Sequence, residues 1–370
     1  MPPMSLLDLP DSCLLAMLQC CTAGPHRSVF NIARAHSRLH QAATVALRSI
    51  HATVRHDQQR DSVMLYLARH GRHIDSVTIY GQPEESSGVW LLSVLPLSVC
   101  QLPPDLQLSS LQLSCLTVQL LPGNGSQGVL QAAAANTPHL KQLRLQRCAL
   151  LDGGDSLATA LLQLPGLEHL SLDGITGGKR TDSINFEAGV LQQLQQLTYL
   201  KIYELGDGAF EPGALAGKTK LQHLELNGCW LSGGAAVVAA LMSQLQHLQQ
   251  LTHLDLHRTL RSQHATAPAA AYSALTAGSK LQYLRLSECT LAAGVWQHMF
   301  PAGRQLPQLQ SIDLSEVMQP GGDYAPVPEG SCLGRCCPGL RFLHAWWLTG
   351  TEEQLRSLRE AVPGARVDCP

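Results

Sequence analysis

The stretch LQHLELNGC, residues 221–229, decides the fold. Its leucines follow the pattern LxxLxL, in which x is any residue, and a cysteine comes three residues after the last leucine. Similarity of a chain to itself at a period of roughly 20–50 residues is the signature of a repeat architecture. Five further stretches show the pattern clearly: LKQLRL from Leu140, LEHLSL from Leu167, LTYLKI from Leu197, LTHLDL from Leu251 and LQYLRL from Leu281.

Weaker copies extend the array toward both ends of the chain. They are LRSIHA from Leu47, IDSVTI from Ile74, LSSLQL from Leu108, LQSIDL from Leu309 and LRFLHA from Leu340, so consecutive copies start 24 to 34 residues apart. This spacing allows a short strand to return through a helix or a helical turn. The pattern is that of about 10–11 leucine-rich repeats. It predicts an α/β solenoid with a curved parallel sheet on the concave face and helices on the convex face.

A cysteine recurs at one position of the repeat. Cys148, Cys229 and Cys289 each stand three residues after the last leucine of their copy. This placement resembles the cysteine-containing and ribonuclease-inhibitor-like families of leucine-rich repeats. The resemblance implies that the three side chains are buried and help to satisfy backbone groups of the loop. We therefore predict reduced cysteines of the core, because a free cysteine packs as a small apolar residue.

The first 46 residues precede the array and predict two or three short amphipathic helices. They resemble an F-box through a Leu-Pro opening and the apolar positions of two helices, namely Leu9, Pro10, Leu14, Met17, Leu18 and Ile32. The resemblance implies that these residues bind a Skp-type adaptor of a cullin ubiquitin ligase. In F-box proteins with leucine-rich repeats, the repeats hold the target. The chain is then expected to be the substrate receptor of such a ligase.

A second interpretation gives the N-terminal helices a structural role only. A solenoid exposes apolar side chains at each end, and terminal units with a polar outer face cover them. If residues 1–46 are such a cap, the chain is a structural scaffold, for example of the cytoskeleton or of a ciliary axoneme. Both interpretations place a protein partner on the repeats.

The C-terminal end shows the signals of a closing cap. Thr351 followed by Gln354 is a capping-box signature, which marks the start of a helix. Leu355 and Leu358 give that helix an apolar stripe, and Val367 fits a final edge strand. The sequence thus predicts three parts: an F-box-like segment at 1–46, the solenoid at 47–350 and a cap at 351–370.

Outward-facing positions of the repeat strands supply the candidate binding residues. Side chains alternate between the two faces of a strand, so residues between the leucines form rows across neighbouring strands. Tyr, Trp and Arg dominate protein–protein hot spots. The alternative is that such rows, and pairs such as Lys201–Glu225 and Asp255–Arg285, only stabilise the sheet. The candidates are His169, Tyr199, Tyr203, His223, His253, Tyr283, Arg285, Phe342 and Trp346.

Charge and hydropathy exclude two classes of partner. The net charge is −2, and lysines and arginines are scattered, without the dense basic patch that follows a phosphate backbone. No apolar run approaches the ~18 residues of a membrane span, and the N-terminus lacks the features of a secretory leader. We expect a cytoplasmic or nuclear protein, or one of the cytoskeleton or cilium, that binds neither nucleic acid nor membrane.

No motif predicts catalysis, a cofactor or a metal. GNGSQG at 123–128 matches GxGxxG, but each repeat is itself a strand, loop and helix, and no acid follows until Asp152. His223, His253 and His257 stand at related positions of neighbouring repeats, but histidines on a solvated sheet are common and no carboxylate or cysteine completes the set. The sequence therefore predicts no enzyme, no cofactor and no metal site.

Overall fold

The computed structural model forms two compact units, Met1–Arg144 and Leu145–Pro370, and the boundary falls within one strand of the repeat array. The F-box-like residues Leu9, Pro10, Leu14, Met17, Leu18 and Ile32 lie outside the described part of the chain. The structure describes residues 48–54, 62–63, 65–67, 71–81, 108–114, 117–118, 138–150, 155–177, 188–204, 210–229, 231, 234–261 and 266–368.

The first unit holds three parallel strands in sequence order. They are β1 (Ser49–Val54), β2 (Ser76–Gly81) and β3 (Ser110–Ser114), and each begins two residues after the start of a weak copy of the pattern. A 3-10 turn, Gly71–His73, precedes β2, and the short β4 (Thr117–Val118) follows β3. The weak copies therefore form strands as the clear copies do.

The second unit continues the pattern with one concave strand for each copy from β5 to β14, and the edge strand β15 of the closing cap follows them. Its parallel strands pair with their neighbours in chain order from β7 to β15. The array starts with β5 (Gln142–Gln146), which crosses the unit boundary, and continues with β7 (His169–Asp173), β9 (Tyr199–Tyr203), β10 (His223–Asn227), β11 (His253–Asp255), β12 (Tyr283–Arg285), β13 (Ser311–Asp313), β14 (Phe342–His344) and β15 (Arg366–Asp368).

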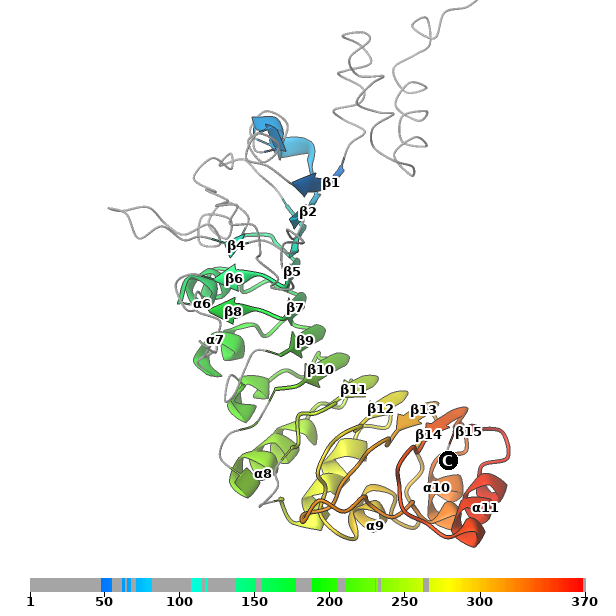
Figure 1. The fold of residues 1–370 in the computed structure, drawn as a ribbon. Helices are drawn as coiled ribbons and strands as arrows, with labels where there is room; N and C mark the ends of the chain where they lie inside the picture. Colours follow the sequence, from blue (N-terminus) through cyan, green and yellow to red (C-terminus); the bar gives the residue numbers. More distant parts are fainter. Residues whose placement is uncertain are drawn as a thin grey trace, which may run out of the picture. The chain divides into compact units, whose positions relative to one another are not determined.

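The return segments of this unit lie on the opposite side of the curve from these strands (Figure 1). Two of them are 3-10 helices, each starting at or after a proline, which presets the backbone for a helical turn. Two further short strands, β6 (Ala149–Leu150) and β8 (Thr176–Gly177), pair in parallel beyond the concave sheet. The helices are α6 (Asp155–Leu162), α7 (Ala188–Gln193), η4 (Pro212–Leu215), α8 (Gly234–Leu245), η5 (Ala269–Thr276), α9 (Val295–Met299), α10 (Gly330–Cys336) and α11 (Glu352–Ala361).

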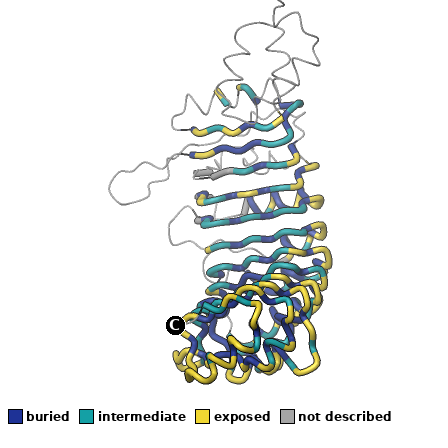
Figure 2. Tube along the Cα trace, turned by 90° about the vertical axis from the view of Figure 1, so that its right-hand side faces the viewer, coloured by how far each residue is buried: buried dark blue, intermediate teal, exposed yellow. Residues whose placement is uncertain are grey.

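The pattern leucines form the core of this unit. Leu221, Leu224 and Leu226 are fully buried, as are their equivalents in the neighbouring repeats. Successive repeats lie as stacked rungs whose exposed residues stand mainly at the turns (Figure 2). One repeat has no other apolar surface on which to place its leucines, so stability comes from stacking on the next repeat.

The recurring cysteines are buried and bond the loop backbone, as the resemblance implied. The thiol of Cys289 donates to the carbonyl of Leu256 at 3.0 Å, and that of Cys229 to Ile202 at 3.5 Å. Thr259 takes the same position in the intervening repeat, and its hydroxyl donates to the carbonyl of Leu226. Burial raises the pKa of the Cys289 thiol to about 12, so this cysteine is a packing residue and not a nucleophile at neutral pH.

Each described concave strand from β5 to β14 ends in a left-handed turn. The residue two positions after the last apolar position of the LxxLxL pattern has φ between 50° and 67° in all eight cases. Only two of the eight are glycine, although other residues adopt this conformation at a cost of about 1–2 kcal/mol. The turn residues are Arg147, Gly174, Glu204, Gly228, Arg258, Glu288, Glu316 and Trp347.

The closing cap forms as the sequence predicts. The Thr351 hydroxyl accepts a hydrogen bond from the Gln354 amide, the Gln354 side chain accepts from the Thr351 amide, and α11 follows. Val367 lies in the edge strand β15, which pairs with β14. Across the residues that the structure describes, no helix has the length and hydropathy to cross a membrane.

Lys218 is a buried cation on the helical side of the second unit. It is 1% exposed, and its ammonium donates to the carbonyl oxygens of Leu191 and Leu194 at 2.6 and 3.2 Å. These carbonyls stand at the end of α7, where the helix dipole favours a cation, and they also accept hydrogen bonds from the backbone amides of Leu194 and Leu197. Burial lowers the pKa of Lys218 to about 8.

This lowered pKa predicts a pH dependence of stability. An exposed lysine has a pKa of 10.5, so the unfolded chain binds more protons than the folded chain between pH 8 and 10.5. The folded state therefore gains stability as the pH rises through this window. Between about pH 7.5 and about pH 9.5, wild type should gain on the order of 1 kcal/mol relative to Lys218→Met. Urea unfolding of both proteins measures the difference, and equal pH dependences would contradict it.

Candidate functional site

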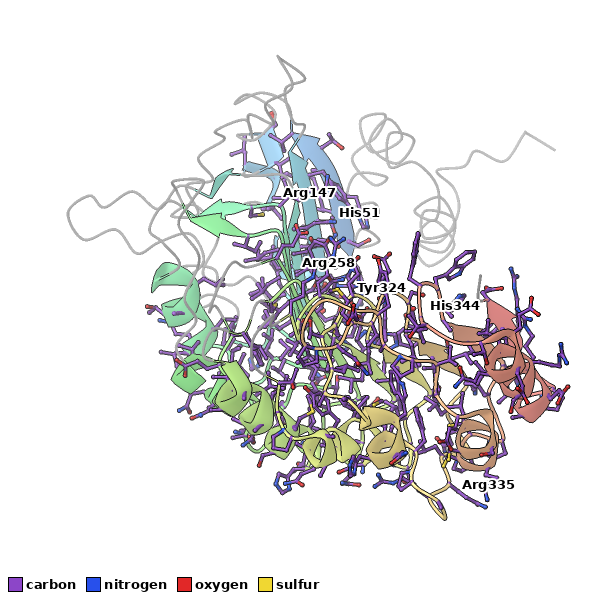
Figure 3. All side chains as sticks on the ribbon, turned by 60° about the horizontal axis from the view of Figure 1, so that its bottom comes forward. His51, Arg147, Arg258, Tyr324, Arg335 and His344 are labelled. Atoms are coloured by element: carbon purple, nitrogen blue, oxygen red, sulfur yellow. The ribbon has the colours of Figure 1, made fainter. Side chains whose placement is uncertain are left out.

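The candidate concave face is the outward side of strands β7 to β14. All nine side chains predicted from the sequence lie on these strands or directly after β14. The strand registers place His223 opposite Tyr199 on one side and His253 on the other, and Tyr283 opposite His253. Figure 3 shows the difference between the faces in the C-terminal repeats, where His344 lies on the strand side and Arg335 on the helix side.

Five rings form a continuous stack across this face. Their centroids are 5.8 Å apart from His169 to Tyr199, 4.3 Å from Tyr199 to His223, 3.9 Å from His223 to His253 and 4.1 Å from His253 to Tyr283. The last two pairs are nearly parallel, at 9° and 4°. The spacing follows from the ~4.8 Å separation of parallel strands, because each ring stands at the same position of its repeat.

Glu225 is the centre of a polar cluster beside the stack. Its carboxylate is 3.1 Å from the Lys201 ammonium and 2.5 Å from His223 Nε2, and it accepts a hydrogen bond from the Tyr199 hydroxyl at 3.4 Å. Burial acts to raise the pKa of Glu225, but the hydrogen bonds from His223 and Lys201 outweigh it and lower that pKa to about 2. The Lys201–Glu225 pair expected from the sequence is confirmed.

His253 lies in the middle of the stack and is kept neutral. Burial between its neighbours, and then the nearby His223, lower the pKa of His253 to about 4. Its imidazole therefore carries no charge at neutral pH, and its ring nitrogens keep a free lone pair for a proton donor or a metal. The sequence groups His253 with His223 and His257, whereas the structure brings His253 together with His223 and with Glu225, which stands two residues after His223.

Arg285 links the next two strands. Its guanidinium is 3.5 Å from the carboxylate of Asp255 and 3.1 Å from that of Asp313, and it also donates to the Ser287 hydroxyl at 2.8 Å. The expected Asp255–Arg285 pair is therefore confirmed, and Arg285 has Asp313 and Ser287 as further partners. With Lys201 and Glu225, these residues give the face paired charges of both signs along its length.

An exposed aromatic cluster ends the face at β14. Phe342 and Trp346 lie there as predicted, and both are exposed. The structure adds Trp347, 58% exposed in its left-handed turn, and Tyr324, whose ring centroid is 5.9 Å from that of Trp347. The adjacent tryptophans at 346 and 347 were a visible signal in the sequence, since tryptophan is enriched at protein–protein hot spots.

This arrangement suits recognition of a folded or extended protein surface. Rings with two rotatable bonds give contact area at low entropic cost, and the stacked row is held rigid by its neighbours. The charged residues are already paired within the face, so they supply orientation and selectivity more than raw affinity.

Comparisons by sequence found no relative of the chain. No protein-family model matches it, and no curated protein matches it. The solved structures do include similar folds, which are therefore similarities of structure at low sequence identity.

An internalin from Listeria monocytogenes has a TM-score of 0.51 and 15% identity, over 92% of this chain and 92% of that one. The TLR13 chain of a TLR13–ssRNA13 complex has a TM-score of 0.50 and 14% identity, over 90% of this chain but only 44% of that one. A leucine-rich-repeat protein of Leptospira interrogans has 14% identity and a TM-score of 0.45, over 90% and 92%. Together with the parallel strands and the repeat pattern, the first two establish the fold of this chain: a leucine-rich-repeat solenoid.

Proposed function

We propose that the chain is a protein-binding receptor that holds its partner on the concave face of the second unit. The observation that carries this proposal is the stacked row of five rings on the same face as the exposed aromatic side chains of Phe342 and Trp346. Aromatic anchors surrounded by polar groups are typical of protein interfaces. The proposal gives the chain itself no catalytic step.

A protein is favoured over RNA as the partner, although the TLR13 chain was solved with an RNA. Lys201 is paired with Glu225, and Arg285 lies between two aspartates. A surface that follows a nucleic acid backbone presents unpaired basic residues in a stripe. On the described concave face Lys201 and Arg285 are instead paired with acidic side chains.

The finer proposal is that the chain is a substrate receptor of a Skp–cullin–F-box ligase. It is supported by the resemblance of residues 9–32 to an F-box and by the order of the parts, with the box before the repeats. In this role the N-terminal segment binds the adaptor, the concave face binds the target, and other subunits transfer ubiquitin.

Adaptor binding is the prediction that separates this role from a scaffold. Purified Skp-type adaptor should co-elute with the full chain in size-exclusion chromatography, and Leu9→Ala with Pro10→Ala should abolish co-elution because the opening of the first helix is lost. Phe342→Ala with Trp346→Ala is the matched control and should leave adaptor binding unchanged. If the adaptor fails to bind wild type, or binds the Leu9/Pro10 variant equally well, the ligase role is wrong.

The alternative, a cytoskeletal or axonemal scaffold, assigns residues 1–46 a capping role. Deleting them should then lower the melting temperature of the chain, because the first strand of the array loses its cover. It should have no effect on adaptor binding, since the scaffold has none.

A further inference from the structure

Three side chains on the concave face converge in a way that the receptor role does not require. His223 and Glu225 belong to β10, and His253 belongs to β11 directly opposite His223. One ligand atom from each, two imidazole nitrogens and one carboxylate oxygen, lies within 4.8 Å of both others. We propose that His223, Glu225 and His253 form a binding site for a divalent transition metal ion, zinc in the first place.

The donor set selects the class of ion. Imidazole nitrogen and carboxylate oxygen bind zinc at about 2.0–2.2 Å, and three protein ligands with an open position are the usual arrangement of non-structural zinc sites. Calcium and magnesium prefer sites made entirely of oxygen, so two histidines exclude them as the natural ion. Cobalt and nickel share the preference for imidazole and serve as probes of the same site.

The site is open on the side that faces solvent. The side chains of His223 and Glu225 are partly exposed, so an ion in solution reaches them without unfolding. The ligands come from adjacent strands of a rigid sheet, which fixes their backbone spacing. Water, or a side chain of the bound partner, completes the coordination on the open side.

Residues around the site already orient the carboxylate. Lys201 bonds Oε2 of Glu225 at 3.1 Å, while His223 contacts Oε1. A metal that takes Oε1 therefore displaces the His223 contact and leaves the Lys201 contact in place. Hydrogen bonds of this kind hold metal-binding side chains in position, and their loss typically weakens binding about 10–100-fold.

Binding requires one change in the stack. The rings of His223 and His253 are 9° from parallel with centroids 3.9 Å apart, whereas a metal lies in the plane of each ring that binds it. The two rings must therefore turn toward a common point. This movement alters their stacking on Tyr199 and Tyr283, so metal binding should change the tyrosine fluorescence of the face.

The test is a titration of the reduced, metal-free full chain with zinc, in which calorimetry and tyrosine fluorescence measure binding. Wild type should bind one more equivalent of zinc than His253→Phe, which keeps a ring in the stack but removes a ligand. Glu225→Gln should lower the affinity for the zinc ion at this site by more than about tenfold. His257→Gln is the matched control, because this histidine lies on the same face outside the set, and it should bind as wild type does.

A cobalt titration separates this site from the cysteines of the chain, because thiolate ligands add a charge-transfer band that imidazole and carboxylate lack. The equivalent lost in His253→Phe should have no such band. Equal stoichiometry and affinity in wild type and both ligand variants, with circular dichroism unchanged, would overturn the proposal. That result would not contradict the proposed receptor function, because partner binding is measured in the absence of zinc.

Discussion

Replacing Leu224 with alanine is expected to lower the free energy of unfolding by about 3 kcal/mol. Leu224 is fully buried on β10 and stands in register between Leu200 and Leu254. The neighbouring strands are held by backbone hydrogen bonds, so they cannot close in on the space that the missing methyl groups leave. The cost is therefore both the lost burial and the cavity.

Urea unfolding followed by circular dichroism measures this loss, and Leu162→Ala is the matched control. Leu162 is 49% exposed at the end of α6, so the same substitution there should change stability by less than about 0.5 kcal/mol. A loss below about 1 kcal/mol for Leu224→Ala would show that the repeats relax around the cavity, contrary to a tightly stacked core.

The second large effect is expected from Gly334→Ala in α10. A Cβ at Gly334 would overlap the backbone carbonyl of Ala361 in α11, and one at Gly330 would overlap that of Ser357. Backbone atoms cannot rotate away, so α11 must shift, and we expect a cost of about 2–3 kcal/mol from overpacking. The closing cap should loosen first, which hydrogen exchange of the α11 amides detects as lost protection.

Gly364→Ala controls for the intrinsic effect of the substitution. No atom lies within 4 Å of a Cβ placed there, so stability should change little. If Gly334→Ala is as stable as Gly364→Ala, the close approach of α10 and α11 is not a constraint on the cap.

The repeat pattern predicted the sheet well because its leucines can be buried only against the equivalent leucines of a neighbouring repeat. Three apolar positions in each copy pack against the same three positions of the next copy. The presence of a strand, its parallel direction and its register are therefore predicted together. This explains why the weak copies at Leu47 and Ile74, in which isoleucine, valine or alanine replaces most of the leucines, still form β1 and β2. The capping box at Thr351 was equally local and equally predictable.

Features that depend on the return segments were not predictable. The pairing of β6 with β8 arises from turn geometry and has no side-chain pattern of its own. The burial of Lys218 depends on where α7 ends relative to the next repeat, and AGKTK alone is typical of a surface turn. The grouping of Glu225 with His253 was not predicted for a different reason, because the two side chains come together only when β10 and β11 are aligned.

The central claim is that a protein partner lies on the concave face, and site-specific photo-crosslinking tests it most directly. A photoreactive phenylalanine analogue would replace Tyr283 or Phe342 on this face, and Gln297 or Arg335 on exposed positions of α9 and α10. In cells of the source organism, the two concave positions should crosslink to the same protein and the two helical positions should not. The same adduct from α9 and α10, with none from Tyr283 or Phe342, would contradict the account.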